Sequence, residues 1–459
     1  MSDPQHDPDA FAREVVQRVP GYRRFLAAQG ADANAAFTDL PLTTKQNYLL
    51  QYPIEEVCWD ASLGHCHIIG SSSGFSKSGS VFWPKRPQDE GGYLKAIETM
   101  LADHYGMDRK RTLILCCMAL GTWFGGMAIT SALRVLATEG RLPITVATPG
   151  LNLAEAAEIY ARFHAQFEQS LWITNPSNIG LITSLLGQRG VTPPAGSCSF
   201  PVVGEYFSEA TREAVARRYG HPEDAPFVVW TGYGSADTGD IAVETAASIA
   251  LRKFFHHHPA LAQQHFGTNE VPMLLAPSPS ALVEIVDGLI VVTRDQLVPL
   301  LRYNTRDRGG MLSRDALASL PGLPADTLAA LPEHILYVHG RASNAVVFYG
   351  TNLDIREIDR FLLELPQDMA YAGLFTIRCE TQDDITHLDL NIMVERDDDP
   401  TLAARYHGAL RSFLTGKSLE FETKYTRLSQ AAGEELIRVS VQRADARTGA
   451  IKHRHIIEP

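Results

Sequence analysis

A stretch rich in serine and glycine, residues 71–80, offers the first set of groups that could do chemistry. Its hydroxyls, the ammonium of Lys77 and the N–H groups beside its glycines could bind phosphate oxygens, because glycine lets a backbone approach a ligand closely. It is not a Walker A loop, since residues 67–69 and 81–83 on its two sides both look like strands. A flexible surface loop would have the same composition, so both interpretations stay open.

Two later segments carry carboxylates beside aromatic and small residues. Residues 233–237 end with Asp237 and follow a predicted strand at 227–231, and ligands bind at the carboxyl ends of strands in open α/β sheets. A carboxylate there suits Mg²⁺, which prefers oxygen ligands. Residues 302–307 end with Asp307. Ordinary turns are the alternative interpretation of both segments.

These segments, together with Arg341 and with Lys452 near the end, resemble the adenylate-forming superfamily when read in order along 459 residues. The phenylacetate–CoA ligase-like branch is the most similar. The resemblance implies an enzyme that uses ATP and Mg²⁺ to convert a carboxylic acid, aromatic or bulky, into an acyl-adenylate with release of pyrophosphate. Coenzyme A would then accept the acyl group.

Two alternatives to a CoA ligase stay open. The acyl-adenylate could instead be transferred to an amine, an amino acid or a carrier protein. The chain could also be a degenerate nucleotide-binding protein without activity, because the serine-rich stretch with Lys77, Asp237 and Ser343 depart from the pattern of the superfamily. Retention of Asp307 and of a C-terminal lysine argues against this second alternative.

The resemblance also implies roles for single residues. The ammonium of Lys452 would offset the repulsion between the attacking carboxylate and the α-phosphate, Asp237 would hold Mg²⁺, and Asp307 would bind the ribose. Trp123, Phe124, Gly125 and Tyr206 would line the acyl pocket. The remaining nucleotide-binding positions would be Ser72, Ser73, Gly74, Ser76, Lys77, Gly204, Glu205, Tyr233, Gly234, Ser235 and Arg341.

Composition sets limits on the class of protein. Hydrophobic residues make up 45% and charged residues 20%, which is ordinary for a globular chain with a large core. A net charge of −12 argues against a general nucleic-acid or anionic membrane surface. Apolar runs are too short to span a bilayer, and six cysteines make no disulfide framework. We therefore expect a cytoplasmic enzyme with small-molecule partners, as a monomer or homodimer.

The elements that must position these residues follow from hydrophobic patterning. Short helices are expected in the first 60 residues, and strand-like and helix-like segments then alternate from 112 to 231. Such alternation predicts an α/β fold with a mainly parallel sheet and helices on both faces. Residues 282–293 predict a β-hairpin that turns at 287–288.

The pattern of apolar residues changes after Gly340. The order helix, strand, helix and strand there predicts a small α+β domain. We expect an adenylation core over residues 1–339 and a mobile lid over 340–459 that carries Lys452. Residues 256–258 with His265 indicate a helical surface segment or the approach to a channel.

Overall fold

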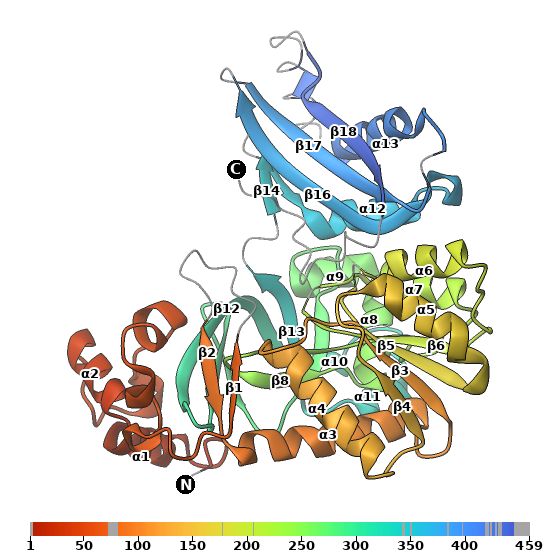
Figure 1. Cartoon of the computed structure of the whole chain (residues 1–459). Coiled ribbons are helices and arrows are strands. Elements are labelled where there is room, and N and C mark those ends of the chain that lie inside the picture. The colour runs from red at the N-terminus through yellow and green to blue at the C-terminus, as the bar shows by residue number, and fades with distance from the viewer. Residues whose placement is uncertain are drawn as a thin grey trace.

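The computed structural model describes residues 3–71, 81–176, 178–204, 206–341, 345–348, 351–382, 385–396, 398–417 and 434–444, and also positions 422, 425, 426 and 429. A large body holds the N-terminal three quarters of the chain, and a smaller C-terminal region lies against one side of it (Figure 1).

One continuous sheet forms the centre of the large body. Within the described residues it has eleven strands, in the order β10 (Leu282–Val286), β11 (Leu289–Arg294), β12 (Leu300–Ser313), β13 (His334–Arg341), β9 (Met273–Pro277), β8 (Gly239–Val243), β7 (Val229–Ser235), β6 (Cys198–Val202), β5 (Gln169–Ile173), β3 (Thr112–Cys116) and β4 (Ile144–Ala147).

The sheet has two halves of different character. Strands β4, β3, β5, β6 and β7 run parallel, and all pairings from β7 to β10 are antiparallel. This confirms the predicted α/β fold with a hairpin-rich part, and the two parts share a single sheet. The predicted hairpin turn at Asp287 and Gly288 is also confirmed, since both residues have positive φ, 51° and 73°.

Helices cover both faces of the parallel half, because β3 has buried apolar side chains on both of its faces. Leu113 and Leu115 pack toward one layer of helices, and Ile114 and Cys116 pack toward the other. The first layer is α5 (Leu153–Phe163), α6 (Asn178–Gln188) and α7 (Glu209–Arg218). The second layer is α3 (Pro87–Tyr105) and α4 (Phe124–Thr138).

Further helices lie outside the parallel half. The bounds of those in the middle of the chain are α8 (Ala246–His257), α9 (Pro259–Phe266), α10 (Arg314–Leu317) and α11 (Ala325–Ala330). No helix among the described residues has both the length and the apolar character that a membrane crossing needs.

The first 60 residues form the short helices that the sequence predicts. Helices α1 (Pro8–Arg18) and α2 (Pro20–Gln29) bury apolar side chains against the segment that leads into β12. Arg302 fastens this layer, because its guanidinium donates to the carbonyls of Thr38 and Leu40. The antiparallel pair β1 (Ile68–Ser71) and β2 (Phe82–Lys85) follows.

The C-terminal region has its own apolar core. The predicted helix, strand, helix and strand are confirmed, and β16 was not predicted. In chain order the region contains β14 (Ala345–Phe348), β15 (Thr351–Asp354), α12 (Ile355–Glu364), β16 (Tyr371–Gln382), β17 (Ile385–Val394), α13 (Leu402–Lys417) and β18 (Ile437–Arg443).

The boundary between core and lid stays a prediction, because β13 still pairs with β12 through Gly340 and Arg341. The two regions are packed together. Ala372 of β16 lies so close to α6 that a Cβ at Gly180 would stand 1.8 Å from its carbonyl oxygen. Arg360 of α12 pairs with Glu270 of the large body at 3.6 Å.

Candidate functional site

A cavity of about 1230 Å³ opens where the parallel strands β5, β6 and β7 end. Ile173, Val203 and Gly232 line it from the sheet side. This is the edge at which open α/β sheets bind their ligands. Its volume exceeds the usual range for a drug-sized molecule, roughly 300–1,000 Å³, so there is room for two joined ligands.

One part of the cavity is apolar and lies between α3 and α4. Trp123, Phe124 and Gly125, the residues predicted for an acyl pocket, line it at the start of α4. The turn before α4 is tight, because a Cβ at Gly126 would stand 1.9 Å from the carbonyl oxygen of Ala119. The other apolar lining residues include Tyr93, Ile97, Met100, Ile129 and Leu133.

A second part of the cavity is polar. Tyr233 lines it and reaches Asp307, which is not among the described residues that line the cavity. The Tyr233 hydroxyl donates to Oδ2 of Asp307 at 2.7 Å and lies 3.3 Å from Oγ1 of Thr305. Burial raises the pKa of Tyr233, so the hydroxyl stays protonated and remains a donor. Strands β8, β9 and β13 stand between β7 and β12 in the sheet order, so the sheet must curl to bring these side chains together.

Asp237 lines the same polar part, in the turn between β7 and β8. Tyr303 donates to its Oδ2 and Ser235 to its Oδ1, which fixes the carboxylate without neutralising its charge. Gln296 donates to the backbone carbonyl of Asp237 at 2.6 Å. Each carboxylate oxygen has two lone pairs, so a hard cation such as Mg²⁺ could still bind.

Other predicted nucleotide residues also lie around the polar part. Gly204, Gly234 and Ser235 line the cavity. Gly234 must be a glycine, since a Cβ there would stand 2.2 Å from the carbonyl oxygen of Gly239 on the paired strand. The backbone of Arg341 pairs with that of Asp307, which places β13 beside the predicted ribose ligand.

Tyr206 is not brought to the cavity with the other predicted acyl-pocket residues. Its hydroxyl lies 2.9 Å from Glu270 Oε1 and 2.8 Å from the carbonyl oxygen of Val271, and its one proton can be donated to either. Its ring lies between the guanidinium groups of Arg252 and Arg356, 5.5 and 5.6 Å from the ring centre. Among the described residues that line the cavity, Tyr206 does not appear.

The rest of the prediction falls on positions beyond the described part of the chain. The strands predicted on both sides of the serine-rich stretch are confirmed by β1 and β2, and Ser71 at the end of β1 lines the cavity. Its backbone N–H donates to the carbonyl of Thr122 at 2.6 Å. The predicted residues outside the described ranges are Ser72, Ser73, Gly74, Ser76, Lys77, Glu205 and Lys452.

Comparison with known proteins gives a fold. No family model and no curated protein matches the sequence. A 2-hydroxyisobutyryl-CoA ligase, solved in the postadenylation state with 2-HIB-AMP, matches 98% of this chain and 88% of its own at 14% identity, with a TM-score of 0.62. GH3.15 acyl acid amido synthetase matches 99% and 92% at 11% identity, with a TM-score of 0.58. The chain has the adenylate-forming fold.

The adenylate-forming fold places several polar residues at the cavity that the sequence analysis missed. Lys45 lines it from the π-helical turn Lys45–Leu49, with its ammonium 5.7 Å from the centre of the Trp83 ring. In the sequence, Thr44 was the sign that a helical turn begins at Lys45, because threonine is a common residue at the start of helices. His104 lines the apolar part and stacks on Phe227, and burial lowers its pKa to about 4, so it is neutral at pH 7.

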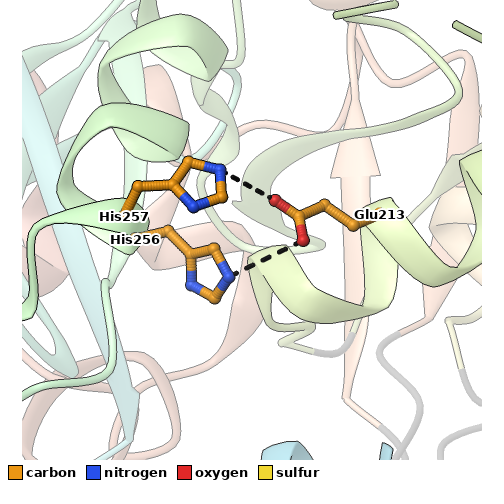
Figure 2. Close-up of side chains that lie close together, drawn as sticks. All are labelled: Glu213, His256 and His257. Carbon is orange, nitrogen blue, oxygen red and sulfur yellow. Dashed lines mark ion pairs between the residues drawn. The ribbon is translucent and has the colours of Figure 1, made fainter. Parts of the chain in front are cut away.

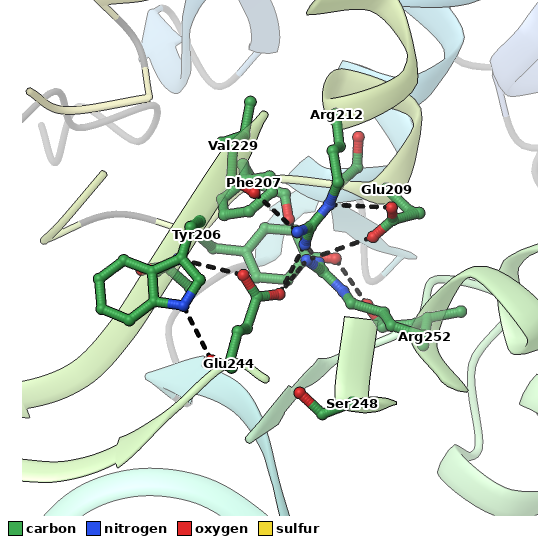
Figure 3. A network of polar contacts seen from close by, with 12 residues as sticks. Tyr206, Phe207, Glu209, Arg212, Val229, Glu244, Ser248 and Arg252 are labelled. Carbon is green, nitrogen blue, oxygen red and sulfur yellow. Dashed lines mark hydrogen bonds and ion pairs between the residues drawn. The ribbon is translucent and has the colours of Figure 1, made fainter. Parts of the chain in front are cut away.

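A sealed ionic cluster supports one wall of the cavity of this adenylate-forming fold (Figure 3). Arg212 lies 2.9 Å from Glu209 and 2.6 Å from Glu244, and Arg252 lies within 3.7 Å of both carboxylates. All four side chains are at most 1% exposed. Glu244 joins this cluster to the cavity, because it lines the cavity and accepts from the backbone of Thr231 at 3.0 Å.

Proposed function

We propose that the protein activates a carboxylic acid with ATP, forming an acyl-adenylate and releasing pyrophosphate. One observation carries the proposal. A single cavity joins the polar side chains of Tyr233 and Asp237 to the apolar chamber between α3 and α4, and Tyr233 connects it to Asp307. A polar part for a nucleotide and an apolar part for an acid, in one cavity of the adenylate-forming fold, suit the joining of these two substrates.

The polar part would bind ATP. Asp307 accepts hydrogen bonds from the ribose hydroxyls, and the bond from Tyr233 fixes both side chains beside the nucleotide. Asp237 holds the Mg²⁺ that arrives with ATP, and this ion supplies positive charge to the phosphates. The remaining ATP ligands in the proposal are Ser72, Ser73, Gly74, Ser76, Lys77, Gly204, Glu205, Gly234, Ser235 and Arg341.

The apolar part would bind the acid. Trp123, Phe124 and the facing side chains of α3 favour an aromatic or bulky acyl group, because burial of apolar surface drives its binding. The carboxylate then lies toward the polar part. Tyr206 is left out of the proposed acyl site, since its hydroxyl is engaged by Glu270 and Val271.

In the reaction, a carboxylate oxygen attacks the α-phosphorus of ATP and the bond to the β-phosphate oxygen breaks. Pyrophosphate leaves with the bonding electrons, and an acyl-adenylate remains. Lys452 from the C-terminal domain, residues 340–459, stabilises the charge that builds up at the α-phosphate. A rotation of this domain against the core, residues 1–339, would then remove Lys452 and admit the acceptor.

Coenzyme A is the proposed acceptor, and an amine or amino acid is the second candidate. Both are supported by the solved structures of this fold, since one is a CoA ligase and the other an acyl acid amido synthetase. A carrier protein is a third acceptor of the same chemical kind. The proposed setting is cytoplasmic, where ATP is available.

Trapping with hydroxylamine tests the proposal. The protein, ATP and Mg²⁺ are incubated with aryl, arylacetic, fatty and amino acids, and hydroxylamine converts any acyl-adenylate into a hydroxamate that mass spectrometry identifies. We expect a hydroxamate and an equal amount of AMP from one class of acid. Replacing hydroxylamine by CoA or by amino acids then identifies the acceptor. ATP binding without AMP formation from any acid would favour a non-catalytic nucleotide-binding protein.

A further inference from the structure

We propose that Glu213, His256 and His257 form a binding site for one divalent transition-metal cation, such as Zn²⁺. The three residues join α7 to the last turn of α8, outside the cavity described above. Figure 2 shows the two imidazole rings and the carboxylate pointing toward one another. This inference is independent of the proposed function.

The donor atoms converge on one point. Nε2 of His257 lies 3.1 Å from one oxygen of Glu213, and Nε2 of His256 lies 3.9 Å from the other. All ligand atoms lie within 4.8 Å of one another. With metal bonds of 2.0–2.2 Å, neighbouring ligands of a tetrahedral Zn²⁺ stand about 3.4 Å apart. The observed spacing therefore needs only small side-chain rotations to accept an ion.

The chemistry of the donors suits a borderline cation. Imidazole nitrogen and carboxylate oxygen are ordinary ligands of Zn²⁺, and imidazoles bind it in their neutral form. Three protein ligands with one open position form a typical zinc site in which water is the fourth ligand. Mg²⁺ and Ca²⁺ prefer oxygen ligands, so two imidazoles select against them.

The three side chains are only partly buried, so an ion and the water that would be its fourth ligand can reach them. His256 and Glu213 are 14% and 24% exposed, and His257 is 61% exposed. The two inner ligands are therefore held by packed helices, and the third faces solvent.

Two neighbouring charges act on the site in opposite directions. The buried carboxylate of Glu209, one turn before Glu213, adds negative potential, and Arg360 of α12 adds positive potential. Arg360 is directed to Glu270, 3.6 Å away, and Glu209 is paired with Arg212 at 2.9 Å. The single carboxylate of Glu213 and the two imidazoles thus remain as the ligand set.

The competing interpretation is a plain hydrogen bond between helices α7 and α8. It explains the contact of His257 with Glu213, but it gives no role to the convergence of the second imidazole on the same carboxylate. His334 provides a matched comparison, because it lies 3.7 Å from the single carboxylate of Glu333 and is 54% exposed.

Titration calorimetry with ZnCl₂ on the metal-free full chain tests the proposal. We expect one more Zn²⁺ per chain in the wild type than in Glu213→Gln or His256→Gln, with affinity at this site reduced more than about 100-fold by either change, since even indirect supports of a metal cost 10–100-fold. His334→Gln should bind as the wild type does. Unfolding midpoints measured in EDTA check that the variants fold.

Equal Zn²⁺ binding by the wild type and both site variants would overturn the proposal, and so would the absence of Zn²⁺ binding by the wild type. Either result would leave an interhelical hydrogen bond as the role of the cluster. Neither result depends on acid activation, so the two proposals can fail separately.

Discussion

Two groups of charged residues lie on either side of one cavity wall, and they are built differently. In the sealed cluster, Arg212 and Arg252 are paired with Glu209 and Glu244, and none of the four is more than 1% exposed. In the polar part of the cavity, the carboxylate of Asp237 accepts from the hydroxyl groups of Tyr303 and Ser235, and Tyr233 donates to the nearby Asp307.

The difference shows how the same residue types serve structure or chemistry. A guanidinium neutralises the carboxylate that it orients, so the sealed charges contribute to packing and to the position of β7. A hydroxyl orients a carboxylate and leaves its negative charge available to a cation or a ribose. Removing one member of a buried ion pair leaves the other charge buried with neither a partner nor water. The main effect of such a change should be a lower free energy of unfolding. Substitution of a carboxylate that hydroxyl groups orient should lower the activity more than the stability.

The largest effect is expected from Arg212→Met. It leaves Glu209 and Glu244 buried with one guanidinium between them, so the free energy of unfolding should fall by about 3–5 kcal/mol. Arg162→Met is the matched control, because Arg162 also pairs with a glutamate on a helix but is 69% exposed. Its change should stay below about 1 kcal/mol. Urea denaturation followed by circular dichroism measures both, and equal losses would remove the distinction between the two groups.

Lys452→Ala should affect only chemistry. We expect adenylation to fall by about 10²–10³-fold, as typically follows the loss of one charge-stabilising group, with no change in the denaturation midpoint. Lys110→Ala, at an exposed position before β3, should keep full activity. Full adenylation by Lys452→Ala would mean that another cation, of which Lys45 in the cavity is the first candidate, does this work.

Asp237→Asn and Asp240→Asn compare two carboxylates that line the same cavity. The amide keeps the shape but loses the charge, so adenylation should fall by about 10²-fold while stability is kept. Asp240 lines the same cavity but pairs with Arg294 at 3.1 Å, so Asp240→Asn should lose about 1 kcal/mol of stability and keep its activity. The reverse pattern in these two variants would contradict the account.

A smaller effect concerns Asp359 of α12, a half-buried carboxyl that accepts from a hydroxyl and lies away from the cavity. Burial raises its pKa to about 7, while its Oδ1 accepts from Tyr371 at 2.8 Å. In the unfolded chain this aspartate has its ordinary pKa of about 4. Between about pH 4 and pH 7 the carboxyl is therefore protonated in the folded state and ionised in the unfolded state. Stability should therefore fall as pH rises through this range, by up to about 1.4 kcal/mol per pH unit.

Denaturation midpoints at pH 5 and pH 7 measure this effect. Asp359→Asn should flatten the difference, and Asp368→Asn, at an exposed position in the same region, should not. The same pH difference in the wild type and in Asp359→Asn would show that this carboxyl titrates normally.

Much of the fold could be predicted because local patterns agree with the final structure. Strands and helices alternate from β3 to β7, as predicted for residues 112–231, and the turn at Asp287 and Gly288 has the positive φ values of its type. Strand β16 was missed because its apolar pattern is interrupted. Gly373 has a φ of 77°, and the register shifts between Tyr371 and Phe375.

The candidate site was partly predictable for a different reason. Asp237, Tyr233 and Asp307 stand in motifs whose order resembles that of a superfamily. The structure brings Asp237 and Tyr233 to one cavity and Asp307 to the Tyr233 hydroxyl. The sealed cluster had no such signal. Glu209 and Arg212 have the appearance of the polar face of an amphipathic helix, and only the tertiary packing of α8 brings Arg252 to them.

The most direct test of the account is ATP–pyrophosphate exchange with Mg²⁺, measured for the wild type and for Asp307→Asn against the same set of acids. The account predicts exchange in the wild type that depends on one class of acid. It also predicts a large loss in Asp307→Asn with an unchanged denaturation midpoint. Exchange at the wild-type rate in Asp307→Asn, or no acid-dependent exchange in a wild-type protein that binds ATP, would contradict it.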